Sequence, residues 1–223
     1  RDAGGRIQAS SIDGSLAGWC PAEVGFGDGG TVKPMLFGAQ TGATGVTAAF
    51  YARQGMKGPP RLLESKLGYF ATSSSQPRLD GGPWRDAWAL ARPRRKLHAC
   101  CGYLHSAVDA TGKLRAEIGR AIEDGTITVY VPPYVAEVVS KEAPPLSAND
   151  ARFHLQYCLA LVVNGEEVIQ PEHSIEFASY LAKPEVVRAQ GRIRVVADPA
   201  LTHYHQCRVA IDRAGRPRRE QRV

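Results

Sequence analysis

A short stretch rich in Ser, Gly and Pro, residues 72–83 (TSSSQPRLDGGP), divides this sequence into two parts of different character. These residue types favour turns and loops, and Gly or Pro inside a helix or strand weakens it. The stretch is therefore predicted to be a linker. We expect one domain over residues 1–75 and a second over residues 84–223, since 223 residues can hold two modest cores.

The first part has the pattern of a helical domain. Residues 7–16 predict a short helix, and residues 39–54 predict a longer one that Gly55 is placed to end. Many Gly, Ala and Thr residues in the longer helix indicate close helix–helix contact. The pair Pro59-Pro60 favours a further short helix through Leu67. In the longer helix four residues recur at helical spacing: Val46, Ala49, Phe50 and Arg53.

The second part mixes helices and strands. An apolar face predicts a helix over about residues 103–123, and Ser147 is a plausible N-cap for a helix through Val163, with Asp150 at its third position. Runs of β-branched residues predict three strands, at Thr126–Val131, Arg192–Ala197 and Gln206–Ile211. The predicted class is α+β, a helical segment followed by a small two-layer α/β domain.

Charge and cysteine usage narrow the possible partners. The formal net charge is +6, and the basic residues are bunched at 92–96 and 213–222, where solvated loops or frayed ends are expected. No aromatic interleaving or recognition helix accompanies them, so we expect no nucleic-acid partner. No apolar run approaches the roughly 20 residues that span a bilayer. The five cysteines form no CxxC pair, which favours a reducing, cytoplasmic compartment.

Two further patterns are interpreted as structural. His203 and His205 alternate on one face of an extended segment, but two ligands without a third make a poor metal site, so no metal is expected. The glycine-rich residues 25–30 (GFGDGG) lack the preceding strand and following helix that a phosphate-binding loop requires.

The stretch from Lys96 to Ala110 (KLHACCGYLHSAVDA) resembles the hallmark of the MmgE/PrpD family, which includes 2-methylcitrate dehydratases and cis-aconitate decarboxylases. That hallmark is a Lys, an aromatic-Pro-Cys-Cys turn, and a His that leads into a helix with an Asp-Ala pair four residues on. His98 and Ala99 stand here in place of the aromatic residue and the Pro. These departures weaken the turn but keep its register.

Two other blocks are similar to the same family. Residues 32–69 resemble its long helix after a Lys-rich turn, with Leu36 where relatives often have His. Residues 145–157 (PLSANDARFHLQY) resemble a helix of its smaller lid domain. The resemblance implies part of an all-helical domain followed by the lid. The family's longer N-terminal helical segment and its C-terminal helices are expected to be missing.

The resemblance implies a small polycarboxylate substrate, a citrate-like hydroxy-tricarboxylate or cis-aconitate, and no cofactor. Lys33 and Lys96 are carried over as carboxylate-binding residues that could clamp one anion from two sides of a cleft between the domains. His105 is carried over as the acid–base residue, because imidazole titrates near neutral pH. Cys101 stands where some relatives have His and is expected to line the pocket. The structural alternatives to these catalytic roles are that the lysines are ordinary surface residues, that His105 only terminates a helix, and that the cysteines are small core residues.

The sequence leaves three functions open. Dehydration and decarboxylation place the same kinds of charged groups around the same polyacid, and a dicarboxylate isomerase or epimerase would share the proton abstraction. The third possibility is a non-catalytic remnant that acts in assembly or anion binding. The resemblance also implies a homodimer formed through the helical part. Tyr134 is expected to serve lid packing.

Overall fold

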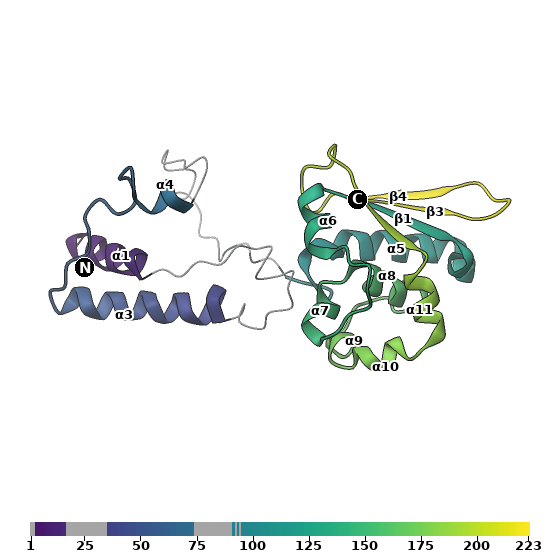
Figure 1. Cartoon of the computed structure of the whole chain (residues 1–223), viewed down its shortest axis with the longest axis horizontal. Coiled ribbons are helices and arrows are strands. Elements are labelled where there is room, and N and C mark those ends of the chain that lie inside the picture. The colour runs from purple at the N-terminus through teal and green to yellow at the C-terminus, as the bar shows by residue number, and fades with distance from the viewer. Residues whose placement is uncertain (1–2, 17–34, 74–90, 92, 94) are drawn as a thin grey trace. The chain divides into compact units, whose positions relative to one another are not determined.

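The computed structural model describes residues 3–16, 35–73, 91, 93 and 95–223 of the chain. These residues fall into two compact units (Figure 1). The first holds the described residues before Arg95, and the second runs from Arg95 to Val223. The predicted domain boundaries at residues 75 and 84 lie outside the described ranges.

The first unit is helical, as predicted. Helix α1 spans Ala3–Ser15, a π-helical turn spans Met35–Gln40, α3 spans Thr41–Arg53 and α4 spans Tyr69–Ser73. Helices α1 and α3 pack together, with Thr44 and Ala48 of α3 buried. Beyond the end of α3, Gly58 also lies close to α1, since an added Cβ there would lie 2.5 Å from the Cβ of Ser11. Gly55 ends α3 with a φ of 88°, which confirms its capping role.

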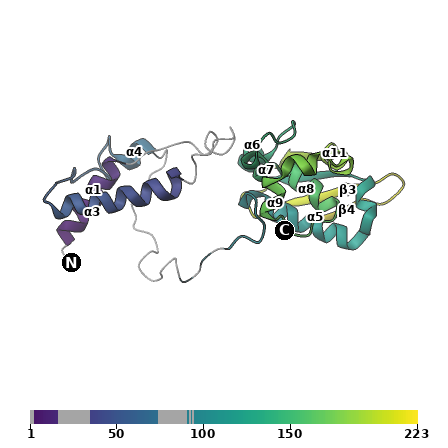
Figure 2. The same ribbon diagram turned by 90° about the horizontal axis from the view of Figure 1, so that it is seen from below.

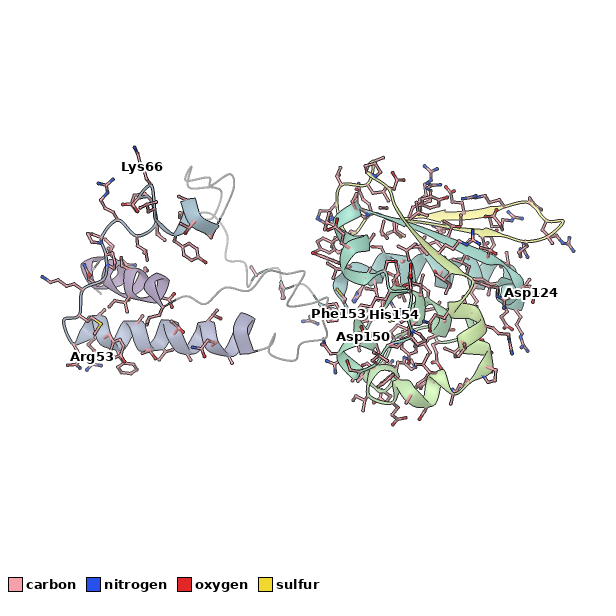
Figure 3. The ribbon with its side chains drawn as sticks, in the orientation of Figure 1. Arg53, Lys66, Asp124, Asp150, Phe153 and His154 are labelled. Atoms are coloured by element: carbon pink, nitrogen blue, oxygen red, sulfur yellow. The ribbon has the colours of Figure 1, made fainter. Side chains whose placement is uncertain are left out.

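Two expectations for this unit are wrong. Residues 60–67 form turns in place of the helix expected after Pro59-Pro60. The first two residues of the predicted linker, Thr72 and Ser73, belong to α4. The α3 face that carries Val46 and Phe50 points to solvent, because these side chains are 59% and 58% exposed while the smaller Thr44 and Ala48 meet α1. Packing in this unit therefore rests on small side chains. Arg53 lies in the last turn of α3 (Figure 3).

The second unit confirms the α+β class. A 3₁₀ turn at Gly102–Leu104 leads into α5 (His105–Ile118), and a second 3₁₀ turn covers Gly119–Asp124. The predicted helix over 103–123 is thus an α-helix between two 3₁₀ turns, since Gly119 adopts a φ of 61°. The remaining helices are α6 (Pro133–Val139), α7 (Ala148–Arg152), α8 (Leu155–Val163), α9 (Pro171–Ile175), α10 (Phe177–Leu181) and α11 (Pro184–Gln190).

A four-stranded mixed sheet runs in the order β2-β1-β3-β4. Strand β1 (Thr126–Val131) pairs in parallel with β2 (Ile193–Ala197) and antiparallel with β3 (Arg208–Asp212). All three predicted strands are confirmed, with shifts of one or two residues at some ends. Pro132 follows β1 directly and is the N-cap of α6, and Pro133 is the first residue of that helix, where its fixed φ is tolerated.

The fourth strand, β4 (Arg219–Arg222), corrects the expectation of a loop or frayed end over residues 213–222. It pairs antiparallel with β3, and Gly215 with a φ of 65° lies in the connecting turn. The hairpin extends beyond the helices in Figure 1. Ion pairs from Arg208 to Glu220 (3.3 Å) and from Arg218 to Asp212 (3.4 Å) join its strands. Charged side chains suit an exposed edge strand, which explains the lack of an apolar signal.

Helices α5 and α8 pack against each other and against the sheet. Both overlap the strands in the view of Figure 2. Strand β1 alternates between buried and half-buried residues, so Ile127, Val129 and Val131 face the core. Every residue of α8 is buried, as expected for the central helix of a small unit. No helix within the described ranges is long and apolar enough to span a membrane.

The single helix predicted from Ser147 to Val163 is interrupted. Ser147 caps α7 as expected, since its Oγ accepts a hydrogen bond from the Asp150 amide at 3.0 Å. Phe153 and His154 then leave the helical conformation between α7 and α8 (Figure 3). His154 starts the second helix because its Nδ1 accepts from the Tyr157 amide at 3.2 Å. Histidine is an uncommon N-cap, so the break carried no sequence signal.

The cap on α7 gives a first prediction. We expect Ser147→Ala to lower the free energy of unfolding by about 1 kcal/mol, because the Asp150 amide loses its acceptor. Ser147→Asp keeps an acceptor and should retain most of the stability. Urea denaturation followed by circular dichroism measures both. Leu146→Ala, at a neighbouring side chain that is 86% exposed, is the control and should change little. An equal loss in Ser147→Asp would contradict the capping role.

Candidate functional site

The motif segment 98–101 is fixed to the second unit by two backbone hydrogen bonds. The Ala99 amide donates to the Ile169 carbonyl at 2.7 Å, and the Cys101 amide donates to the Arg152 carbonyl at 2.9 Å. The Arg152 carbonyl is available because α7 ends there and leaves its last carbonyls without helical partners. The interruption between α7 and α8 therefore supplies one of the two anchors of the segment.

Lys96 lies two residues before this segment, with its side chain exposed. Its Nζ donates a hydrogen bond to the Cys100 carbonyl at 3.1 Å, which turns the ammonium group back over the turn. Among the described residues, no carboxylate lies within ion-pair distance of it. An ammonium group held by a neutral carbonyl keeps its charge available to an anion.

His98 has a structural role. It is 2% exposed, and its Nδ1 accepts a hydrogen bond from the Ile169 amide at 3.2 Å. Because Nδ1 is the acceptor, the ring proton sits on Nε2, which donates to Asp109 at 3.0 Å. His98, which replaces the aromatic residue of the family hallmark, thus joins the segment both to Ile169 and to α5.

His105, the first residue of α5, lies against His98 with ring centroids 5.1 Å apart in an edge-to-face arrangement. Its ring is half-buried, and its Nε2 is buried without a hydrogen-bond partner in the described part of the chain. Contact with the Cys100 side chain raises the pKa of His105, against the opposing effects of burial and of the Lys96 charge. His105 is therefore the histidine of this pair that can exchange a proton.

Cys100 lies between His105 and Cys158 of α8. Hydrogen bonding with Cys158 lowers the pKa of the Cys100 thiol most. Burial opposes this effect, and the neighbouring His105 and His98 add to it. The same contact with Cys100 and full burial raise the pKa of Cys158. Of these two thiols, Cys100 is the one whose pKa is lowered. Cys207 is a contrast, since burial raises its pKa to about 12.

The structure brings together three of the four predicted site residues. Lys96, Cys101 and His105 all lie in the stretch from residue 96 to residue 105, around the Cys100 turn. Cys101 is half-buried and follows the buried Cys100. Lys33 lies outside the described residues, so the two-lysine clamp stays a prediction. Sequence reasoning missed the pairing of Cys100 with Cys158, because nothing in the sequence connects a motif cysteine with one on a distant helix.

The other expected roles concern aromatic residues near this segment. Tyr134 is 40% exposed and packs edge-to-face on Tyr103, with ring centroids 5.9 Å apart. His203 and His205 have ring centroids 5.1 Å apart, and the His205 amide donates to the His203 Nδ1 at 3.3 Å. No third His, Cys, Asp or Glu joins them in a metal-binding group within the described ranges.

Comparison with known proteins decides the family. The model of the MmgE/PrpD C-terminal domain matches residues 98–222, which is more than half of the chain and includes the Cys100–His105 turn. The chain belongs to the MmgE/PrpD family. It is also similar to the cis-aconitate decarboxylase of Aspergillus terreus (strain NIH 2624 / FGSC A1156), with 25% identity over 177 residues that cover 71% of this chain and 35% of the fungal enzyme. The chain thus spans about a third of that relative's length.

In this MmgE/PrpD chain the site joins a fixed cation to an imidazole that can carry a proton. Lys96 can neutralise a carboxylate, and a protonated His105 can donate to a nearby basic atom. The raised pKa of His105 favours its protonated form and thus the role of a general acid. The positions of the Lys96 ammonium and the His105 imidazole both depend on the backbone around Cys100.

The two hydrogen bonds of the His98 ring give the second prediction. We expect His98→Phe to lower the free energy of unfolding by about 1–3 kcal/mol, because the ring is kept while the buried Ile169 amide loses its acceptor. Chemical denaturation measures the loss. Leu97→Ala, at a neighbour that is 68% exposed, should change stability little. A His98→Phe protein as stable as the wild type would show that the His98 bonds do not hold the segment.

Proposed function

We propose that the complete protein is a cofactor-independent lyase that acts on a citrate-like polycarboxylate, of the 2-methylcitrate dehydratase or cis-aconitate decarboxylase type. The main support for this proposal is that the Lys96 ammonium, which makes no ion pair among the described residues, lies near the imidazole of His105 at the Cys100 turn. Membership of the MmgE/PrpD family and the similarity to a cis-aconitate decarboxylase support the reaction class.

Lys96 would bind one carboxylate of the substrate through a charge-assisted hydrogen bond. In dehydration, a base removes a proton from carbon, the C–H electron pair forms the double bond, and the hydroxyl leaves as water with a proton from an acid. In decarboxylation, the C–C electron pair stays on carbon as CO₂ departs, and an acid then protonates that carbon. In both reactions a cation beside the carboxylate stabilises the negative charge that develops.

His105 would supply the proton that both reactions require. A general acid must be protonated at the working pH, and the contact with Cys100 that raises the pKa of His105 favours this state. Cys101 would line the same pocket, and Lys33 would hold a second carboxylate. We further propose that the complete protein is cytoplasmic and works as a homodimer.

Two alternatives are separated by assay. A dicarboxylate isomerase or epimerase would use the same acid to return a proton to carbon, so its product would have the mass of its substrate. A non-catalytic family member would bind a polycarboxylate without turnover. The departures from the family pattern at Leu36, His98 and Ala99 motivate this second alternative.

The role of Lys96 gives the third prediction. With the full translation product of the gene, we expect turnover of 2-methylcitrate, citrate or cis-aconitate, followed by product chromatography. Lys96→Ala should lower kcat/KM by roughly 10- to 100-fold, the effect of losing one charge-assisted hydrogen bond. Lys96→Arg should retain more activity than Lys96→Ala.

Lys113→Ala removes an exposed lysine of the same unit and is the matched control, expected to leave kcat/KM unchanged. A complete protein that neither binds nor converts any of these acids would overturn the proposal. Equal losses in the Lys96→Ala and Lys113→Ala proteins would reject the specific role of Lys96.

A further inference from the structure

Strand β2 lies at one edge of the sheet, because β1 is its only neighbour there. Before the strand, the Arg192 carbonyl accepts from the Ile127 amide at 3.0 Å. After it, the Asp198 amide donates to the Val131 carbonyl at 2.8 Å. In a parallel pair the residues that bond to the neighbouring strand alternate, so the even-numbered residues of β2 face β1. Three residues therefore have backbone amides and carbonyls that point away from the sheet: Ile193, Val195 and Ala197.

The two edges of the sheet differ in their side chains. Strand β4, at the opposite edge, has charged residues at three of its four positions, and Arg219 forms an ion pair with Glu117 at 3.2 Å. Strand β2 has a single charged residue, Arg194, among apolar ones. Charges along an edge strand oppose the addition of another strand, and an apolar edge favours it. The β2 edge is therefore the one that can accept a further strand.

A cleft of about 640 Å³ follows this edge. Four consecutive residues of β2, from Ile193 to Val196, line it. Successive side chains of a strand point to opposite faces of the sheet, so a cleft that contacts all four residues lies beside the strand and not over one face. Its other walls come from residues 140–144 and from the end of α11. The volume is typical of ligand sites in proteins.

Two buried carboxamides line the cleft and differ in their hydrogen bonds. Gln156 of α8 is satisfied, because its Oε1 accepts from the Lys141 amide and its Nε2 donates to Ser140 Oγ, both at 3.2 Å. Gln190 of α11 is 9% exposed, and its Oε1 has no hydrogen-bond partner in the described part of the chain. A buried amide oxygen without a partner costs free energy, so an N–H group of a ligand would be stabilised beside it.

The contact between Gln190 and His154 does not satisfy the carboxamide. Their two Nε2 atoms are 3.5 Å apart. The Nδ1 of His154 accepts from the Tyr157 amide, so the ring proton sits on Nε2, which donates to the Ala143 carbonyl at 2.8 Å. The contact thus brings two N–H groups together. A peptide group offers both a donor and an acceptor, so it can bond to Gln190 in either orientation of the carboxamide.

We propose that this cleft binds an extended segment of another polypeptide, which adds a fifth strand to the sheet beside β2. The edge supplies amides and carbonyls at every second residue, the repeat of an extended peptide backbone, and Gln190 supplies one more amide group. The inference is independent of the proposed lyase activity, since neither Lys96 nor His105 lines the cleft.

The charged side chains of the cleft indicate which peptide it favours. Lys141 is paired with Asp150, and Glu142 is exposed. Arg194 is exposed, with no carboxylate within ion-pair distance among the described residues. Opposite charges on neighbouring strands stabilise a sheet, as do apolar side chains that face each other. The favoured peptide therefore has an acidic residue opposite Arg194 and an apolar residue opposite Val195.

The fourth prediction uses the capped peptide Val-Thr-Val-Glu-Val, whose third residue lies opposite Val195 in an antiparallel pair, the more stable direction. In NMR titrations of the full ¹⁵N-labelled chain, the peptide should shift the amide signals of Ile193, Val195 and Ala197 and slow the exchange of the Val195 amide with solvent. Methylation of the third peptide nitrogen should weaken binding about 10-fold, because one hydrogen bond is lost. Methylation of the second nitrogen, which points away from β2, is the matched control and should change little.

Protein variants test the same contacts from the other side. Val195→Pro removes an N–H that faces away from β1, so the pairing with β1 is kept while peptide binding should be lost. Val195→Thr keeps this N–H and should bind as the wild type does. Arg194→Glu should reverse the charge preference, so that Val-Thr-Val-Lys-Val binds more tightly than the Glu peptide. Arg216→Glu, an equal change of charge in the β3–β4 turn, should leave the preference unchanged.

Gln190→Leu separates binding from stability. The variant should weaken peptide binding, because the carboxamide is lost. It should not lower the midpoint of urea denaturation, since it removes a buried polar atom that has no partner in the described part of the chain. A structural role for Gln190 would give the opposite pattern, with a lower midpoint and unchanged binding.

Several outcomes would reject the proposal. One is a wild-type chain that binds neither peptide, and another is equal weakening by methylation of the second and third nitrogens. An unchanged charge preference in Arg194→Glu would reject it even if Val195→Pro failed to fold. Protection of the Val195 amide without peptide would show that the edge is already paired, as it would be by β2 of a second copy. None of these readouts depends on turnover, so failure of the lyase assay leaves them interpretable.

Discussion

The site depends on the attachment of residues 98–101 to the end of α7. One amide of this segment donates to the Arg152 carbonyl and another to the Ile169 carbonyl. A carbonyl at a helix end can accept such a bond, whereas one in the middle of a continuous helix is already used. The orientation of Lys96 and His105 follows from these anchors, since both residues flank the anchored turn.

The neighbourhood of the turn shows how a small core accommodates polar groups. His98 and His154 are both buried, and each uses both ring nitrogens in hydrogen bonds. Burial lowers the pKa of His154, which keeps that ring neutral and structural. His105 differs because its Nε2 has no hydrogen-bond partner among the described residues and a thiol lies beside the ring. The contrast between satisfied and unsatisfied imidazoles separates the supporting histidines from the candidate catalytic one.

The sequence predicts local features well and distant contacts poorly. The β-branched run of β1 and the N-cap at Ser147 were confirmed because their signals lie within a few residues. Strand β4 escaped prediction because its stability comes from pairing with β3 rather than from apolar alternation. The helix break at His154 and the partnership of Cys100 with Cys158 depend on three-dimensional neighbours. The family motif located Lys96 and His105 but did not show what surrounds them.

The parallel pairing of β1 with β2 has a consequence for the order of folding. Ile127 pairs with Ile193, and between them the chain passes through α6 to α11. Ala99 and its hydrogen-bond partner Ile169 are likewise separated in sequence by α5 to α8. Contacts between residues so distant in sequence carry a loop-closure cost, which places folding of such topologies on the order of milliseconds to seconds. The motif turn is held by such distant contacts, so we expect it to form no earlier than the helices that hold it.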